Sequence, residues 1–245
     1  EKMTAKQHNV KGIILAGGTG SRLFPLTKVT NKHLLPVGNK PMIFHPVEKL
    51  IEIGIKNILI VTGVEHMGDV VQLLGSGKDF GCQFTYKVQD EAGGIAQALS
   101  LAEHFVGGER SIVILGDNVF ADSLQTSFDA FLKQEKGARL LLKEVPDPQR
   151  FGVPTLDGKQ ITKVTEKPSD PDSNYAVTGI YMYDGQVFDF VNQCSPSERG
   201  EMEITDVNNF YIEKGQCEYD MFKDWWTDAG TFESLRHANA LLAMS

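Results

Sequence analysis

The sequence predicts an α/β protein of three layers, in which helices cover both faces of a central mixed, mostly parallel β-sheet. Up to about residue 145, short apolar runs that are typical of buried strands alternate with longer segments that are typical of helices. Strands that alternate with helices favour right-handed crossovers and a parallel sheet. After Pro146 the segments shorten and Asp157-Gly158 is typical of a hairpin turn, so we expect a smaller, partly antiparallel lobe to follow.

The predicted strands of the first half are built on apolar runs at residues 11–15, 57–62, 84–88, 111–115 and 138–145. The predicted helices between them cover residues 42–53, 67–74, 95–103 and 124–134, and Gly54 closes the first of these helices. Ligands of such sheets bind beyond the carboxyl ends of the strands. The residues that follow strands 11–15 and 111–115 are therefore the first candidates for a site.

The second half contains shorter predicted elements. We expect strands at 152–156, 161–166 and 175–183, and helices at 205–213 and 231–244. Residues 1–9 are polar, which indicates a disordered lead or an expression remnant. Nothing in the composition divides the remainder, which predicts a single domain over residues 10–245.

Composition places the chain among ordinary globular proteins. Hydrophobic residues make up 41% of its 245 residues and charged residues 23%, and no apolar run approaches the length of a membrane span. The cysteines, Cys82, Cys194 and Cys217, are odd in number and far apart, which favours reduced thiols in a cytoplasmic protein over disulfides or a zinc site. The net charge of −8 argues against a surface that binds nucleic acid.

A glycine-rich loop follows the first predicted strand. Gly17, Gly18 and Gly20 let backbone N–H groups approach an anion closely, while Arg22 and Lys32 supply positive charge in the same segment. We therefore expect a polyphosphate ligand. The spacing excludes a P-loop, because no glycine is followed by Lys-Ser or Lys-Thr at the required distance. It also excludes the dinucleotide fingerprint, because a leucine stands where the third glycine is required.

Two acidic residues are candidates for a magnesium site. Asp117 comes directly after an apolar strand, so its carboxylate points into the expected ligand crevice. Asp228, in the segment Trp-Thr-Asp-Ala-Gly, is the candidate for a second carboxylate. Magnesium is usually held by one or two carboxylates together with phosphate oxygens and waters. The alternative interpretation of each aspartate is a turn residue or a helix cap.

Two further segments carry groups suited to a sugar phosphate and to a base. Glu166 can accept hydrogen bonds from sugar hydroxyls and Lys167 can hold a monophosphate, although this pair alone could equally be an exposed ion pair. Gln89 has a donor and an acceptor for the edge of a pyrimidine, and Gly94 lets the backbone approach a flat ring. The alternative for these two residues is a turn at a helix entry with a solvated glutamine.

In this order, the segments resemble the sugar-nucleotide pyrophosphorylases, and among them the short-chain glucose-1-phosphate thymidylyltransferases. That signature runs Gly-Gly-x-Gly-x-Arg-Leu-x-Pro-Leu-Thr, a gap, then Lys-x-Leu-Leu-Pro, and residues 17–27 and 32–36 match it. The similarity covers residues 11–230 and includes Gly-Ile-Tyr at 179–181 and Gly-Glu-Met-Glu-Ile-Thr-Asp at 200–206. The sequence departs from the family at Asn31-Lys32-His33, where Ser-Lys-Gln is common, and at Thr227 and Ala229, where Leu and Thr are usual.

The resemblance implies a nucleotidyltransferase (Rossmann-like) fold, with a nucleotide-binding half over about residues 10–145 and a sugar-binding half over about 146–245. It implies catalytic roles for Arg22, Lys32, Asp117 and Lys167, and Mg²⁺ bound by Asp117 and Asp228. The residues expected to contact the nucleotide are Leu15, Gly17, Gly18, Gly20, Ser21, Arg22, Lys32, Gln89 and Gly94. The residues expected to contact the sugar phosphate are Asn118, Gly152, Glu166, Lys167 and Val177.

The activity implied by the resemblance joins dTTP and α-D-glucose 1-phosphate to give dTDP-glucose and pyrophosphate, the first step towards dTDP-deoxysugars such as dTDP-rhamnose. The sugar phosphate is already anionic at neutral pH, so the obstacle to reaction is charge repulsion rather than the lack of a base. Two alternatives stay open: a uridylyltransferase, whose base differs by one methyl group, and a non-catalytic nucleotide-sugar sensor. The resemblance also implies a cytoplasmic homo-oligomer, often a tetramer, that binds neither nucleic acid nor membrane.

Overall fold

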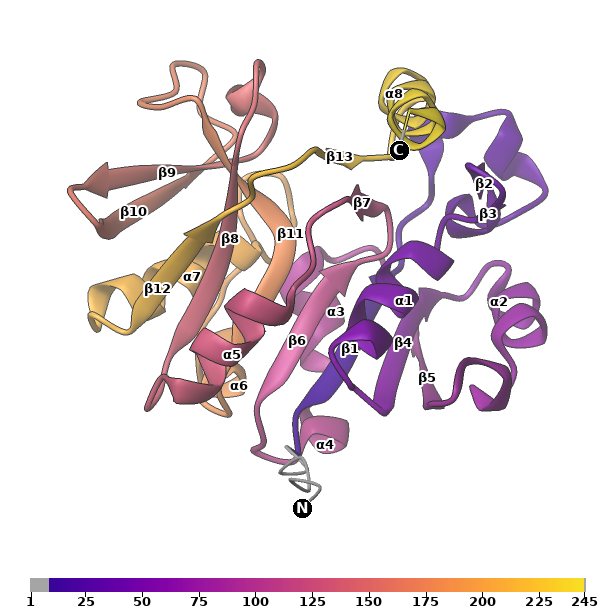
Figure 1. The fold of residues 1–245 in the computed structure, drawn as a ribbon, viewed down its shortest axis with the longest axis horizontal. Helices are drawn as coiled ribbons and strands as arrows, with labels where there is room; N and C mark the ends of the chain where they lie inside the picture. Colours follow the sequence, from indigo (N-terminus) through magenta and orange to yellow (C-terminus); the bar gives the residue numbers. More distant parts are fainter. Residues whose placement is uncertain (1–8, 245) are drawn as a thin grey trace.

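A nine-stranded mixed sheet runs through the centre of the computed structural model, which describes residues 9–244 (Figure 1). The strands follow the order β10, β9, β11, β6, β1, β4, β5, while β8 pairs with β11 and with β12. Their bounds are β1 Lys11–Ala16, β4 Asn57–Gly63, β5 Gln83–Gln89, β6 Ser111–Leu115, β8 Ala138–Glu144, β9 Gly152–Asp157, β10 Gln160–Glu166, β11 Tyr175–Tyr183 and β12 Cys217–Met221. Strands β6, β1, β4 and β5 are parallel, and β11 joins them antiparallel to β6.

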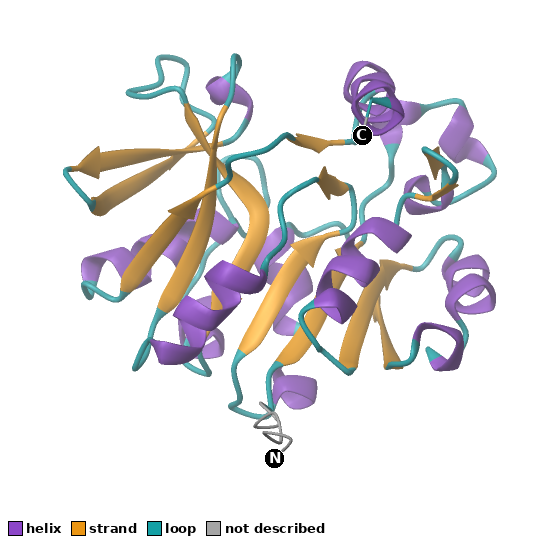
Figure 2. Ribbon diagram, viewed as in Figure 1, coloured by secondary structure: helices purple, strands orange, loops and turns teal. Residues whose placement is uncertain are grey.

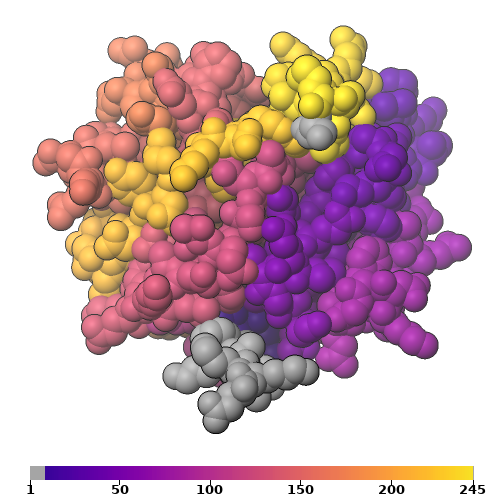
Figure 3. Space-filling model, in the orientation of Figure 1, coloured from indigo at the N-terminus to yellow at the C-terminus, as the bar shows by residue number. Residues whose placement is uncertain are grey.

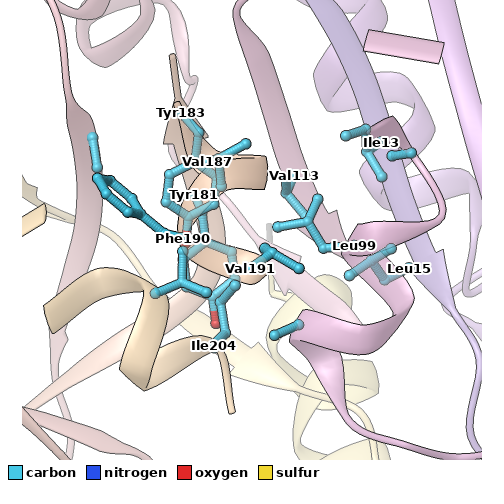
Figure 4. Close-up of a cluster of buried hydrophobic side chains, with 14 of the residues drawn as sticks. Ile13, Leu15, Leu99, Val113, Tyr181, Tyr183, Val187, Phe190, Val191 and Ile204 are labelled. Atoms are coloured by element: carbon cyan, nitrogen blue, oxygen red, sulfur yellow. The ribbon is translucent and has the colours of Figure 1, made fainter. Parts of the chain in front are cut away.

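The sheet is covered on both faces because its central strands are apolar on both faces. Successive side chains of a strand point to opposite faces, so Ile13 and Leu15 enter one core cluster and Ile14 enters the other. Helices α3, α4, α6 and α7 cover the first face and α1, α2 and α5 the second (Figure 2). The helix bounds are α1 Phe44–Glu52, α2 Met67–Leu74, α3 Ile95–Ser100, α4 Glu103–Val106, α5 Gln125–Lys133, α6 Val187–Val191, α7 Ile204–Glu213 and α8 Phe232–Ala243. Figure 4 shows part of the first cluster, where Ile13 and Leu15 lie near Leu99 of α3.

The second half of the chain continues the same sheet. Strands β9 and β10 form the expected hairpin, and Gly158 in its turn has φ 59°, which glycine adopts without strain. Strand β11 pairs with both β6 and β8, so the strand at 138–144 lies among strands of the second half. In the space-filling view the early part of the chain lies on one side and the middle part on the other, while the C-terminal segment packs against the early part (Figure 3). The division into a nucleotide-binding and a sugar-binding half stays a prediction.

Most predicted elements are present, and the strands differ from their predicted bounds by at most one residue at either end. The prediction of one helix over 95–103 is wrong, because α3 ends at Ser100 and α4 begins at Glu103. Between these helices, the N–H groups of Leu101 and Ala102 donate to carbonyls three residues back, so the backbone tightens.

Several short elements were not predicted, and two of them position the site. Strands β7 (Asn118–Phe120) and β13 (Trp226–Asp228) pair antiparallel, which places Asp228 opposite Asn118. A second short pair, β2 (Pro36–Val37) and β3 (Lys40–Pro41), lies below α8. A third core cluster joins these parts and includes Leu23, which anchors the glycine-rich loop from within.

The described residues also bear on the predictions from composition. No described helix is both long enough and apolar enough to cross a membrane. The three cysteines are unpaired and partly buried, in agreement with the free thiols expected from their spacing. Of the expected disordered lead, residues 1–8 lie outside the described residues.

Candidate active site

The candidate site lies where strands β1 and β6 end. These neighbours are parallel and in register, and the N–H of Gly116 donates to the carbonyl of Leu15 at 2.9 Å. The loops that follow the two strands therefore meet at one edge of the sheet, as the sequence predicted. Two cavities of about 350 and 310 Å³ open there. Both are lined by Arg22, Ile95, Leu115, Asp117 and Lys167.

The smaller cavity contains most of the residues predicted to bind a nucleotide. Its lining includes Leu15, Gly17, Gly18, Arg22, Lys32, Gln89 and Gly94. Gly20 and Ser21 lie in the same loop but outside this lining. Gly20 has φ 62°, and its carbonyl accepts a hydrogen bond from Thr27 Oγ1 at 2.8 Å, which closes the loop. Gly18, with φ 91° and open space beside it, leaves its backbone accessible to a ligand.

Gln89 fills the wall opposite the glycine-rich loop. A methyl group built on Gly17 would lie 2.3 Å from Gln89 Oε1, so glycine is required for the glutamine to sit there. Gln89 Nε2 donates to Gln97 Oε1 and, at 3.4 Å, to the carbonyl of Gly94. Its amide is thus held within the protein, and its role in reading a base stays a prediction.

A backbone bridge connects this wall to the second half of the chain. The N–H of Met202 donates to the carbonyl of Gly93 at 2.8 Å, and the N–H of Ala96 donates to the carbonyl of Met202 at 3.0 Å. Gly94, at φ 98°, passes so close that a methyl group on it would lie 2.5 Å from the Met202 carbonyl oxygen. The loop after Gln89 is therefore fixed against the segment that leads into α7.

Each candidate metal ligand is paired with a cation. Asp117 accepts a hydrogen bond from Lys32 Nζ at 2.7 Å, and both side chains are largely buried. Burial is the largest single effect and would raise the pKa of Asp117, but several opposing effects, led by the charge of Lys32 and including hydrogen bonds from Lys32 and Asn118, together outweigh it, so the pKa is lowered. Asp228 accepts two hydrogen bonds at 3.2 Å from Arg150 Nη2. Burial, reinforced by the nearby Asp117, raises the pKa of Asp228 against the opposing effect of Arg150.

The geometry around Gly230 fits a magnesium ion bound together with phosphates. A methyl group on Gly230 would lie 3.1 Å from Asp117 Oδ2, 3.7 Å from Asp228 Oδ2 and 3.3 Å from Arg22 Nη2. The missing side chain leaves a hollow onto which both carboxylates converge. The described residues contain no group of three or more His, Cys, Asp or Glu side chains that could hold a metal. Two carboxylates with open positions suit Mg²⁺, which binds protein through few ligands and takes the rest from phosphate and water.

The larger cavity contains all five residues predicted to contact the sugar phosphate, namely Asn118, Gly152, Glu166, Lys167 and Val177. Glu166 Oε2 accepts a hydrogen bond from Thr205 Oγ1. Lys167 has φ 43°, unusual for a residue with a side chain, and its Nζ lies 3.8 Å from Glu166 Oε1. Backbone strain of this kind is concentrated at functional sites.

Asn118 is held on several sides by the protein itself. Its Oδ1 accepts from the N–H of Gly179 at 2.9 Å and from Trp226 Nε1 at 2.7 Å. Its Nδ2 donates to Asp117 Oδ1 at 3.1 Å. Asn118 therefore orients a candidate metal ligand and ties β7 to β11 and β13, which the sequence interpretation did not include.

Sequence reasoning missed several residues of the larger cavity. The main omission is Arg150, whose Nη1 lies 2.8 Å from Asp147 Oδ2 while its Nη2 pairs with Asp228. Its guanidinium carbon lies 5.1 Å from the centroid of the Phe151 ring. Its only local signal is an arginine in a turn after Pro148. Thr205 was missed as well, and its hydroxyl donates a hydrogen bond to Glu166. The other missed lining residues are Ile95, Leu115, Phe151, Gly179, Tyr181, Glu203, Ile204, Asn208 and Trp226.

His33 lines the smaller cavity as a neutral ring. It is buried, and its Nδ1 lies 2.8 Å from Asn31 Oδ1. Because Asn31 Oδ1 also accepts the backbone N–H of His33 at 2.9 Å, it is an oxygen, and Nδ1 must carry the ring proton. Burial, together with the charge of Lys32, lowers the pKa of His33 to about 3.

We expect His33 to make the protein less stable in mild acid. The pKa of His33 is about 3 in the folded state and ~6.5 in the unfolded chain. Between these pH values the unfolded state binds more protons than the folded state, so the free energy of unfolding falls as the pH decreases. Between pH 7 and pH 4.5 the wild type should lose about 2.5 kcal/mol more unfolding free energy than His33→Gln. Urea unfolding of both proteins at each pH measures this difference. The control is His104→Gln at an exposed position, and parallel pH curves for wild type and His33→Gln would contradict the prediction.

Comparison with known proteins defines the class. Residues 11–245 match the nucleotidyl transferase family, so the chain belongs to this family and is a nucleotidyltransferase. A Neisseria meningitidis protein named glucose-1-phosphate thymidylyltransferase is 41% identical over 233 residues, covering 94% of this chain and 81% of that protein.

Two solved structures are also similar. One is a Bacillus anthracis protein assigned as a glucose-1-phosphate thymidylyltransferase and solved in complex with sucrose, at 59% identity and TM-score 0.92, with 95% of this chain and 94% of that chain covered. The other is a UDP-glucose pyrophosphorylase complexed with UDP-glucose, at 26% identity and TM-score 0.86, with 96% of this chain and 98% of that chain covered. The predicted fold class and family are thereby confirmed.

Proposed function

We propose that this protein transfers a thymidylyl group from dTTP to glucose 1-phosphate and releases pyrophosphate. The observation that carries the proposal is the junction of the two cavities, which share Arg22, Asp117 and Lys167. A triphosphate in the smaller cavity and a monophosphate in the larger one would meet at these charges. The names of the relatives support dTTP and glucose 1-phosphate as the substrates.

The reaction needs no general base from the protein. A phosphate oxygen of glucose 1-phosphate forms a bond to the α-phosphorus of dTTP. The bond from this phosphorus to the oxygen that bridges the α- and β-phosphates breaks, and pyrophosphate leaves with the electron pair. The nucleophile is already anionic at neutral pH, since the second pKa of a phosphate monoester is ~6. The protein must therefore align two anions and offset their repulsion.

The residues divide this task between them. Arg22 would face the triphosphate, because its guanidinium makes no ion pair within the described residues and lines both cavities. Lys167 would hold the sugar phosphate, since its one ion pair among the described residues is a long contact of 3.8 Å with Glu166. Asp117 and Asp228 would hold Mg²⁺, which when bound supplies further positive charge to the phosphates. Lys32 and Arg150 would then turn from these carboxylates towards phosphate oxygens.

Two other functions are outcomes of the same test. A uridylyltransferase is favoured by the structural similarity to a UDP-glucose pyrophosphorylase, and the methyl group of thymine discriminates by only about 1–3 kcal/mol. A sensor without catalysis would bind nucleotide sugars and release no pyrophosphate. The cytoplasmic location, the homo-oligomer and the supply of dTDP-deoxysugar synthesis stay predictions.

We expect pyrophosphate release with dTTP and glucose 1-phosphate in the presence of Mg²⁺. The measurement is a coupled pyrophosphate assay with dTTP, UTP, ATP and GTP against several hexose 1-phosphates. The kcat/KM with dTTP should exceed that with UTP by about 5- to 150-fold, the range of one methyl group. A higher value with UTP would favour the uridylyltransferase. Binding of dTDP-glucose without turnover of any pair would favour the sensor.

A further inference from the structure

A buried amide in the lining of the larger cavity lacks one hydrogen-bond partner among the described residues. Asn208 of α7 is 1% exposed and lines this cavity. Its Oδ1 accepts a hydrogen bond from the Tyr183 hydroxyl at 2.6 Å. Its Nδ2, equally buried, has no acceptor among the described residues. An unpaired buried donor is costly, so its retention beside a cavity points to a ligand.

The direction of this amide is fixed from behind. Tyr183 is fully buried and stacks between Tyr181 and Tyr211, with ring centroids 5.9 and 5.6 Å apart. Burial raises the pKa of Tyr183 well above its usual value, so the hydroxyl keeps its proton and remains a donor. Because that donor requires the Oδ1 of Asn208, the Nδ2 faces away from Tyr183. Figure 4 shows Tyr181, Tyr183 and Ile204 in this buried cluster.

The neighbouring groups complement a neutral hydroxyl. Thr205 and Asn208 are three residues apart on α7 and therefore share one face of the helix. Thr205 holds Glu166, whose carboxylate can only accept hydrogen bonds when ionised. The lining of the cavity thus includes an acceptor on Glu166 and an unpaired donor on Asn208. A sugar hydroxyl can both donate and accept, which matches this pair, whereas a phosphate could not donate to Glu166.

We propose that Asn208 is a specificity-determining residue that donates through Nδ2 to one hydroxyl oxygen of the hexose in the larger cavity. The proposal rests on the proposed function and adds the residue that distinguishes among hexose 1-phosphates. It assigns Asn208 to the sugar and not to the nucleotide. The apparent affinity for dTTP is therefore independent of this amide.

The test compares Asn208→Leu with wild type on glucose 1-phosphate and on its 2-, 3-, 4- and 6-deoxy analogues. We expect the variant to lose about 10- to 100-fold in kcat/KM for glucose 1-phosphate, with the KM for dTTP changed less than about twofold. For one deoxy analogue, wild type and Asn208→Leu should have the same kcat/KM, because that analogue lacks the hydroxyl to which Asn208 donates. An equal loss for every analogue, or no loss at all, would overturn the proposal.

Tyr183→Phe is the matched control, because it removes the hydroxyl that fixes the amide from behind while Asn208 keeps its Nδ2 donor. In Tyr183→Phe the kcat/KM for glucose 1-phosphate should still exceed that for this analogue by the wild-type ratio. If Asn208 had a merely structural role, Asn208→Leu and Tyr183→Phe would change this ratio in the same way. If Asn208→Leu does not fold, Asn208→Asp, which keeps an acceptor for Tyr183 and removes the N–H donor, carries the same prediction at pH 8. Wild-type activity is measured first, and a wild type that releases no pyrophosphate would count against the proposed function. In that case calorimetric binding of the same sugar phosphates to wild type and Asn208→Leu would test the role of Asn208 separately.

Discussion

Replacing Arg22 with alanine is expected to lower turnover by about 100-fold or more while the fold is preserved. The side chain is exposed, makes no ion pair within the described residues and faces both cavities, so its removal leaves no buried charge unpaired. Its charge lies where the triphosphate and the departing pyrophosphate would be. The loss should therefore appear in kcat, while the dissociation constant of glucose 1-phosphate stays within about threefold.

The measurement combines steady-state pyrophosphate release with calorimetric binding of the sugar phosphate. Arg236→Ala is the matched control, because Arg236 is an exposed arginine on α8 outside both cavities. It should leave kcat unchanged. Unchanged turnover in Arg22→Ala would refute the assignment of Arg22 to the transition state.

Replacing Asp117 with asparagine is expected to lower turnover by about 100- to 1,000-fold and to raise the Mg²⁺ concentration required for half-maximal activity. Asparagine keeps the size of the side chain and removes its charge. One of the two carboxylates at the hollow beside Gly230 is lost, and Lys32 loses its buried counter-charge. Breaking a buried ion pair costs about 3 kcal/mol, so the variant should also unfold at a lower urea concentration at pH 7.

The pH dependence distinguishes the two effects of this substitution. The pKa of Asp117 is lowered in the folded state, so its contribution to stability is complete above the unfolded pKa of ~3.9 and is lost as pH falls through the folded value. The stability difference between wild type and variant should thus persist from pH 8 to pH 5. Binding of Mn²⁺, followed by electron paramagnetic resonance, reports the metal site without turnover. Asp129→Asn, at an exposed position on α5, is the control, and equal Mn²⁺ affinity in wild type and Asp117→Asn would count against the metal assignment.

The fold was largely predictable because its central strands carry strong local signals. Strands such as β1 and β4 are apolar on both faces, and glycines and charged turns separate them from amphipathic helices. Strand β12 (Cys-Glu-Tyr-Asp-Met) was missed because it is half polar and lies at an edge of the sheet. Strand β13 was missed because three residues are too few for any periodicity.

The site was predictable where its residues follow strand ends in fixed motifs. Asp117 and the glycine-rich loop are of this kind, since the parallel register of β1 and β6 brings them together. Arg150 was not predictable, because its partner Asp228 lies 78 residues away and the pairing depends on the short β7–β13 ladder. The role proposed for Asn208 could not be predicted, because it rests on an unpaired buried N–H, which exists only after Tyr183 and α7 have packed together.

The bridge from Gly93 and Ala96 to Met202 limits how such an enzyme can change its substrates. The wall beside Gln89 and the segment that leads into α7 share main-chain hydrogen bonds, and the close approach of Gly94 to Met202 requires glycine at that position. If one half of the chain were exchanged for that of a relative, the new half would have to form the same main-chain bridge as well as the β6–β11 pairing. Individual side chains at the walls can change without disturbing either. Point substitutions in the walls are therefore expected to alter substrate preference with less loss of stability than an exchange of halves, which thermal unfolding of both kinds of variant would measure.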